Sequence, residues 1–133
     1  MTNKEVVTRF FVEGYVHHNY DFLMEHMATN YLDNSPCAAR TNLECVNILK
    51  GTEQIFPDMQ VEILNLIEEN DQVAVRVRFS GTHSAELCGI SATGKKISFE
   101  ALEIFQIKNG LIVESWGYWP DAQIQALLRD PLK

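Results

Sequence analysis

The chain has 133 residues, 46% of them hydrophobic and 22% charged, and its net charge is -7. A chain of this length can bury about two-thirds of its surface, so we expect one domain over residues 1–133 that folds without a metal or a disulfide. The acidic charge and the scattered Lys and Arg residues argue against a nucleic-acid partner. No apolar run approaches the roughly 20 residues of a membrane span, and the N-terminus lacks the pattern of a signal peptide, so we expect a cytoplasmic protein without a membrane partner.

Three cysteines, Cys37, Cys45 and Cys88, form an odd set without C-x-x-C spacing. We interpret them as reduced thiols in an ordinary interior, with a metal or nucleophilic role as the alternative. The histidines lack carboxylates or cysteines at the spacing of metal ligands, so no metal site is expected.

The N-terminal half begins with helix signals. Thr2–Glu5 has the form of a capping box, and the apolar residues after it recur at helical spacing, which predicts a helix over about Asn3–His17. Asp21 is a candidate cap for a short second helix. A strand or an extended segment is expected over Asn30–Pro36.

A third helix is predicted after a second capping-box pattern, Thr41–Glu44. Pro57 ends it, and Gly51 predicts a kink or an earlier end. A short last helix is expected to begin at Pro120, with apolar residues along one side.

The segment between these helices alternates as strands do. Two strands, over residues 60–68 and 72–82, flank a tight turn at Asn70-Asp71. A second hairpin, residues 97–119, turns at Asn109-Gly110, where both residues tolerate positive φ. Helices followed by an antiparallel meander indicate an α+β fold, with the helices packed on one face of a curved sheet.

The second hairpin predicts which carboxylates share a face. Constant pairing from its turn places Glu100 on the same face as Gly117 and opposite Trp119, whereas Glu103 lies on the other face. Both faces are largely apolar, so we expect the hairpin to lie inside the sheet and to be covered at least in part on both sides.

Several segments after Phe56 resemble one known family. They are Phe56–Asp58 (FPD), Ser80–His83 (SGTH), Gly89–Lys95 (GISATGK) and Phe105–Trp116 (FQIKNGLIVESW). In order and spacing they are similar to the SnoaL-like polyketide (ester) cyclases. That family belongs to the cone-shaped, cystatin-like fold of nuclear transport factor 2 and ketosteroid isomerase.

The resemblance implies a pocket between the helices and the concave face of a curved antiparallel sheet, often in a homodimer that pairs through the outer sheet faces. In the family this pocket holds an aromatic or polyketide ester, and an aspartate acts as acid and base for aldol ring closure without a cofactor. That aspartate is expected just after the tryptophan that Trp116 matches, where this chain has Gly117. A second acidic position of the family falls on Pro120, so Asp121 is the neighbouring candidate, with a helix cap as its alternative role.

Other candidate site residues follow from the hairpin and from the resemblance. Glu100, near the space left by Gly117, would be a partly desolvated general acid or base if its face is the inner one; otherwise it is a rim residue paired with Lys or Arg, and Glu103 competes for the catalytic role. His83 ends a core-facing strand and is a candidate proton shuttle or a loop histidine. Asn34 matches a polar position that holds a substrate carbonyl, or it makes a turn.

Four aromatic residues would give such a pocket flat walls or would simply be core: Tyr15, Trp116, Tyr118 and Trp119. The sequence therefore predicts a pocket protein for an apolar or aromatic small molecule, with cofactor-free cyclase or isomerase chemistry as its function. The alternative is a non-catalytic binding or dimeric assembly module of the same fold.

Overall fold

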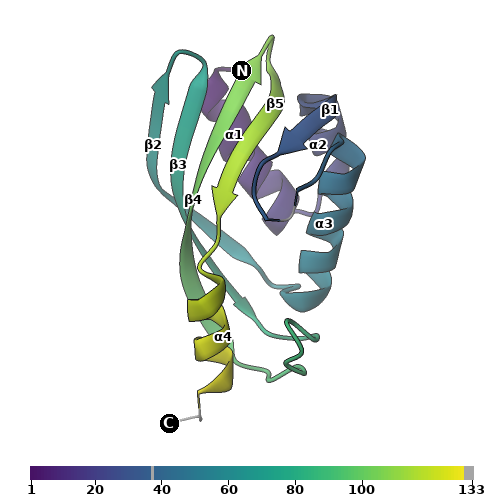
Figure 1. The fold of residues 1–133 in the computed structure, drawn as a ribbon, viewed down its shortest axis with the longest axis vertical. Helices are drawn as coiled ribbons and strands as arrows, with labels where there is room; N and C mark the ends of the chain where they lie inside the picture. The colour runs from purple at the N-terminus through teal and green to yellow at the C-terminus, as the bar shows by residue number, and fades with distance from the viewer. Residues whose placement is uncertain (37, 131–133) are drawn as a thin grey trace.

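A curved five-stranded sheet forms one layer of the protein. The helices of the N-terminal half of the chain cover its concave face (Figure 1). The computed structural model describes residues 1–36 and 38–130. The strand order is β1-β5-β4-β3-β2, and all neighbours are antiparallel except β1 and β5, which are parallel. This α+β arrangement is the expected one.

The helical segments are α1 Asn3–Phe11, the π-helical turn η1 Val12–Val16, α2 Tyr20–His26, α3 Asn42–Ile55 and α4 Asp121–Arg129. The strands are β1 Met27–Asp33, β2 Gln60–Glu69, β3 Gln72–Thr82, β4 Lys96–Lys108 and β5 Leu111–Tyr118. Helix α4 lies beyond the end of β5, at the opposite end of the sheet from the N-terminus (Figure 1). No described helix is long and apolar enough to cross a membrane.

Both predicted helix caps form, and at Thr2 the capping box is complete because Glu5 Oε1 accepts a hydrogen bond from the Thr2 backbone N–H. At Thr41 the described contacts contain the hydroxyl cap alone. The Thr2 hydroxyl accepts a 3.1 Å hydrogen bond from the backbone N–H of Glu5, and the Thr41 hydroxyl accepts one of 3.0 Å from Glu44. Each bond satisfies one of the backbone donors that a helix start leaves unpaired. The earlier helix end predicted at Gly51 as one alternative is wrong, because α3 continues past it to Ile55.

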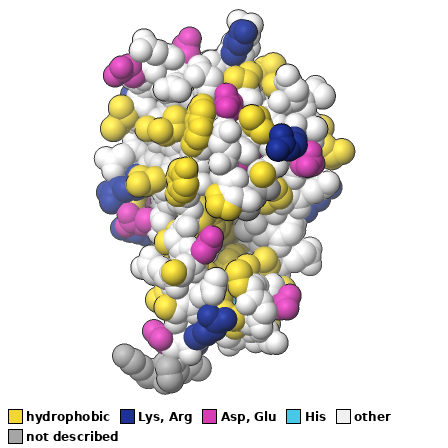
Figure 2. Space-filling view, in the orientation of Figure 1, with side chains coloured by type: hydrophobic (Ala, Val, Ile, Leu, Met, Phe, Trp, Pro, Cys, Tyr) yellow, Lys and Arg dark blue, Asp and Glu magenta, His cyan; other side chains and the backbone are white. Residues whose placement is uncertain are grey.

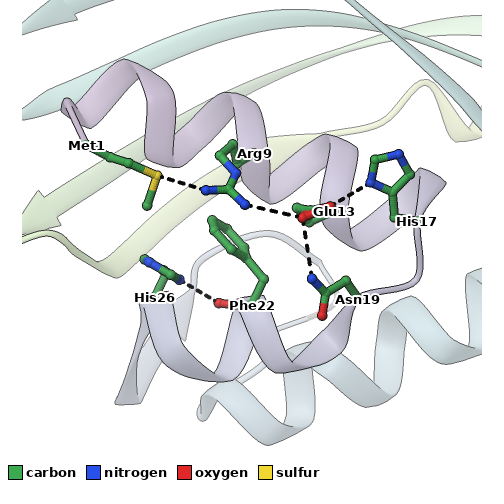
Figure 3. A network of polar contacts seen from close by, with 7 residues as sticks. All are labelled: Met1, Arg9, Glu13, His17, Asn19, Phe22 and His26. Atoms are coloured by element: carbon green, nitrogen blue, oxygen red, sulfur yellow. Dashed lines mark hydrogen bonds and ion pairs between the residues drawn. The ribbon is translucent and has the colours of Figure 1, made fainter.

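The first helix departs from its prediction after Phe11, where the chain widens into η1. Glu13 in this turn accepts hydrogen bonds from Arg9 and Asn19, both at 3.4 Å, and contacts His17 at 2.6 Å (Figure 3). These contacts lower the pKa of Glu13, the His17 bond most of all. The network joins α1 to the start of α2 through the π-helical turn.

The core lies between the helices and the concave face of β3 and β4. Its central members, each almost fully buried, are Val6, Val7, Phe11, Val73, Val75, Val77, Phe79 and Phe105. At about 25 cal/mol per Å² of buried apolar area, side chains of this kind supply the main stabilisation of the fold. Of the three cysteines, Cys45 is buried and Cys88 is exposed, whereas Cys37 lies outside the described residues.

The two hairpin turns form where predicted. Asn70 and Asp71 have φ of 51° and 61°, and Asn109 and Gly110 have φ of 51° and 77°. The predicted register of the second hairpin is wrong beyond its first two pairs, because the pairing shifts between Gln106 and Ile107.

The shift comes from one extra residue in β5. Ile107 pairs with Ile112 but Gln106 pairs with Glu114, so Val113 has no partner across the hairpin. Such a bulge moves every later residue by one place. Gly117 therefore faces Glu103 rather than Leu102.

The convex face of the sheet is open in the described chain, contrary to the expected partial cover on both sides. Arg76 and Arg78 lie there, and both bind the Glu100 carboxylate. Hydrophobic side chains also gather on this face of the sheet (Figure 2). Their exposures are 64% for Ile67, 60% for Leu102, 41% for Ile104 and 65% for Tyr118.

Candidate functional site

A cavity of about 260 Å³ lies between the concave face of β1, β5 and β4 and the helical layer. Its aromatic walls include Phe10, Tyr15, Tyr31 and Trp119. Tyr15 comes from η1, and its ring lies 5.0 Å from that of Phe79 and 6.0 Å from that of Trp119. The π-helical turn thus brings an aromatic side chain from the helical layer to the cavity.

Glu103 is the acidic group at the centre of this site. It lies in phase with the buried residues of β4, and its Oε2 atom is shielded from solvent with no hydrogen-bond partner among the described residues. Burial, reinforced by the negative charge of Asp33, raises the pKa of Glu103 to about 8, although a hydrogen bond from Trp119 acts in the opposite direction. A carboxyl group of this pKa is mostly neutral at pH 7 and can donate a hydrogen bond.

The missing side chain of Gly117 makes room for Glu103. A Cβ atom at position 117 would lie 2.6 Å from Glu103 Oε1 and 3.1 Å from its Cγ and Cδ. The Glu103 carboxyl group therefore occupies the space that any other residue at position 117 would fill.

Asp33 lies on the other side of β5 from Glu103. It ends β1, pairs with Ser115, and its Oδ1 accepts a 2.8 Å hydrogen bond from the backbone N–H of Ser35. Tyr31, two residues earlier on the same face, shares a 2.5 Å hydrogen bond with the Ser115 hydroxyl. That bond fixes β1 against β5 beneath the cavity.

The charge of the lining has one sign. Asp33, Glu103 and Asp121 contribute to it, and none of the described residues that line the cavity is Lys, Arg or His. Among the described residues no group of three or more His, Cys, Asp or Glu side chains is placed to hold a metal ion.

Besides Glu103, four of the candidate site residues singled out in the sequence border this cavity. Tyr15 and Trp119 form its walls, and Tyr118 and Asp121 lie at its edge, with Asp121 exposed in the first turn of α4. Their suggested roles remain predictions.

Glu100 does not border the cavity. It lies on the convex face, where its carboxylate binds Arg76 at 3.0 Å and Arg78 at 3.2 Å and its side chain is 39% exposed. The expected placement of Glu100 beside Gly117 and opposite Trp119 is therefore wrong, because the bulge in β5 was not visible in the residue spacing.

His83 and Asn34 also lie away from the cavity lining. His83 is fully buried, and its Nδ1 accepts a 3.1 Å hydrogen bond from the backbone N–H of Thr93. The Asn34 amide donates to Glu114 at 2.8 Å and to the Ser115 carbonyl at 3.2 Å.

Trp116 does not border the cavity either. It pairs with Ile104 and borders a separate hollow on the convex face of the sheet.

Sequence reasoning did not single out Asp33 or Tyr31. The signal was present, since a strand that enters at Asn30 places Tyr31 and Asp33 on one face and Asn34 on the other. The structure has that alternation, and it is the Tyr31 and Asp33 face that borders the cavity.

Comparison with known proteins gives a family match over most of the chain. A model of the SnoaL-like polyketide cyclase family matches residues 5–128. Comparison with curated protein sequences found no matching relative.

Solved structures share the fold at low sequence identity. A candidate SnoaL-like polyketide cyclase from Jannaschia sp. CCS1 is 20% identical, with a TM-score of 0.89 over 98% of this chain and 93% of its own. IdmH, a candidate polyketide cyclase from Streptomyces antibioticus, is 22% identical, with a TM-score of 0.86 over 96% and 99% of the two chains. AclR from Streptomyces galilaeus, described as a candidate hydroxylase, is 22% identical, with a TM-score of 0.84 over 98% and 85%.

Proposed function

Because this chain belongs to the SnoaL-like polyketide cyclase family, we propose that it is a cofactor-free acid-base catalyst of the cyclase or isomerase type. Its substrate would be an apolar, ring-bearing carbonyl compound of the polyketide or aromatic ester class. The aromatic walls of the cavity suit flat rings, and candidate polyketide cyclases are among the solved structures that share this fold.

The observation that carries this proposal is the position of the Glu103 carboxyl group over Gly117. The family resemblance implies an aspartate at position 117, and the glycine there cannot move a proton. Glu103 reaches the same space from the neighbouring strand, directly across the hairpin. We infer that Glu103 takes the role of that aspartate.

The environment of Glu103 suits this role. A carboxyl group with a pKa of about 8 exchanges its proton readily near neutral pH, and in its neutral form it can hydrogen-bond to a substrate carbonyl. That bond would become stronger as negative charge develops on the oxygen.

The non-catalytic alternative has one supporting observation, the apolar convex face. A homodimer that pairs through Ile67, Leu102, Ile104 and Tyr118 would cover it. We propose such a dimer for this protein, and it is compatible with either function because the cavity opens on the opposite face of the sheet. A cytoplasmic location stays a prediction.

A thermal-shift panel of aromatic, steroid-like and polyketide-like carbonyl compounds tests the pocket. A compound present at 100 times its dissociation constant adds about 2.7 kcal/mol, which raises the melting midpoint of a domain this size by several degrees. The panel is repeated with Glu103→Gln and with Glu100→Gln as the matched carboxylate on the convex face.

We expect one chemical class to stabilise the native protein and the Glu100→Gln variant equally. The same compounds should shift the melting midpoint of Glu103→Gln by a different amount. If no compound shifts the midpoint of the native protein, the small-molecule function is wrong and the assembly module is favoured.

A further inference from the structure

We infer that Asp33 is the proton acceptor that works together with Glu103, and that the substrate is a compact carbon acid whose acidic C–H bond adjoins a ring carbonyl. This inference rests on the proposed function and adds to it a second catalytic residue and a substrate class. Glu103 donates to the carbonyl oxygen, and Asp33 removes the proton from the neighbouring carbon.

The sheet places the two carboxyl-bearing residues on the two strands that flank β5. Asp33 on β1 pairs with Ser115, and Glu103 on β4 pairs with Gly117. Neighbouring strands lie about 4.8 Å apart, so the backbones of β1 and β4 are separated by roughly 10 Å. The Glu103 carboxyl group fills the space over Gly117, so a substrate would lie beside it, in the cavity that Asp33 and Glu103 both border.

One carboxylate oxygen of Asp33 is available to accept a proton, as a general base requires. The hydrogen bonds of the described residues engage its Oδ1 through Ser35, and they leave Oδ2 without a donor. Oδ2 of Asp33 is not one of the buried polar atoms that lack a hydrogen-bond partner, whereas Oε2 of Glu103 is one of them. Asp33 therefore keeps an open oxygen in a site where Glu103 is desolvated.

Among the described residues that line the cavity, no Lys, Arg or His side chain competes for either group. The ionisable side chains that border the cavity besides this pair are Tyr15, Tyr31, Cys45, Tyr118 and Asp121. Asp121 lies at the exposed edge, and Tyr31 is held by Ser115. The negative charge of Asp33 thus acts on Glu103 without neutralisation from a Lys, Arg or His side chain of the lining.

The proton transfers balance within the site. The C–H proton moves to Asp33, the electron pair of that bond forms the carbon–carbon double bond of an enol, and the Glu103 proton moves to the carbonyl oxygen. Asp33 becomes neutral as Glu103 becomes a carboxylate, so the site carries one negative charge from the pair before and after the step. The enol carbon then takes a proton back, as in an isomerisation, or attacks an electrophilic carbon of the same molecule, as in ring closure.

The cavity limits the size of the substrate. Sites for drug-sized ligands range from about 300 to 1,000 Å³. With about 260 Å³ available, this cavity fits a compound of about two fused rings better than a four-ring skeleton.

Hydrogen–deuterium exchange of a two-ring ketone tests the inference directly. The probe is 2-tetralone in D₂O buffer, and proton NMR follows the loss of signal from the carbon next to its carbonyl group. The proteins compared are the native chain, Asp33→Asn, Glu103→Gln and Glu62→Gln, a control on the convex face bonded to Arg78. Asn at position 33 keeps an Oδ1 acceptor for Ser35, and Asp33→Ser serves as a second variant should Asp33→Asn fail to fold.

We expect the native protein and Glu62→Gln to exchange the probe at least tenfold faster than buffer. Removal of a general base typically costs 10²- to 10⁴-fold, so Asp33→Asn should fall to the buffer rate while its dissociation constant for 2-tetralone, from the thermal shift, changes less than about threefold. Glu103→Gln should lose most of the rate as well.

Two results would overturn the inference, and they separate it from the proposed function. If Asp33→Asn exchanges as fast as the native protein and Glu103→Gln does not, Asp33 is not the base and Glu103 acts alone. If the native protein binds 2-tetralone without accelerating exchange, or does not bind it, the carbon-acid substrate class is wrong, and the ligand panel above then decides whether the pocket binds carbonyl compounds at all.

Discussion

The buried position of Glu103 has a cost in stability. The unfolded chain ionises this carboxyl group near its ordinary pKa of 4.5, whereas the folded protein holds the proton until about pH 8. The unfolded state is therefore favoured progressively as the pH rises from about 4.5 to about 8. Glu103→Gln removes this effect and should stabilise the protein on the order of 3 kcal/mol at pH 7, with little change at pH 4.5.

Urea unfolding of native and variant protein at several pH values between 4.5 and 8.5 measures this difference. Glu100→Gln is the control, since Glu100 is exposed and its ion pairs with Arg76 and Arg78 contribute at most about 1 kcal/mol. A stability gap for Glu103→Gln that is flat across this range would mean that Glu103 ionises normally in the folded state.

Gly117 and Glu103 should depend on each other energetically. Gly117→Ala forces a Cβ atom toward Glu103 Oε1, and overpacking of this kind costs about 1–3 kcal/mol. In the presence of Glu103→Ala the same Gly117 substitution should cost less, by about 1 kcal/mol or more. Denaturant unfolding of the two single variants and the double variant gives this coupling, and additive effects would contradict the packing described for the pair.

At the residue scale the sequence weighed the two carboxylates of this hairpin but did not predict which of them borders the cavity. It singled out Gly117 as the missing acid and weighed Glu103 against Glu100. The choice depended on a register counted from Asn109-Gly110, and one bulged residue, Val113, moves that register by one place. Nothing in an alternating apolar pattern marks a bulge, because it leaves residue types unchanged.

At the scale of elements, the π-helical turn η1 positions Tyr15 and packs tightly beneath it. A Cβ atom on Gly14 would lie 2.6 Å from Leu49 Cδ2 and 3.3 Å from Leu23 Cδ1. Gly14→Ala should therefore destabilise the protein by about 1–3 kcal/mol and disturb the wall that Tyr15 forms. Thermal unfolding and ligand binding by this variant check both effects.

Gly51 is the matched opposite case, and its substitution is a separate prediction. It lies inside α3 with no heavy atom within 4 Å of a Cβ position. Gly51→Ala should stabilise the protein by about 0.5–1 kcal/mol, because glycine loses more backbone entropy than alanine in a helix. A lower unfolding midpoint for Gly51→Ala would contradict this account.

Local chemistry explains why elements were predicted better than the site. The caps at Thr2 and Thr41 and the turns at Asn70 and Asn109 depend on a few adjacent residues, so the sequence reveals them. The end of α1 at Phe11 depends on how η1 fits against α2 and α3. Contacts between distant segments decide such features, and spacing along the chain does not record them.

At the scale of the whole molecule, the convex sheet face predicts self-association. Stable interfaces bury about 800 Å² on each partner, and the apolar side chains of Ile67, Leu102, Ile104 and Tyr118 provide a centre for one. Leu102→Lys should convert the dimer to a monomer at micromolar concentration in sedimentation velocity. Leu43→Lys is the control, since Leu43 is 55% exposed on α3, far from that face. A native protein that is already monomeric would contradict the proposed dimer.

The α+β fold itself could be predicted from the sequence, because the spacing of apolar residues changes from helical to alternating in the order of the helices and hairpins. The resemblance to SnoaL-like cyclases added the cone-shaped pocket, and the family match over residues 5–128 agrees with it. What the whole chain could not reveal is which hairpin face is concave, since both faces are rich in apolar residues.

The exclusion between Gly117 and Glu103 has an evolutionary consequence. A side chain at position 117 would overlap the space that the Glu103 carboxyl group now fills, so a chain with acids at both positions would have to move Glu103. A relative with its acid at position 117 should carry a smaller residue at position 103. Relatives should therefore divide into two groups at these positions, with paired substitutions separating them, and a search for the acid at a single aligned column would overlook one group entirely.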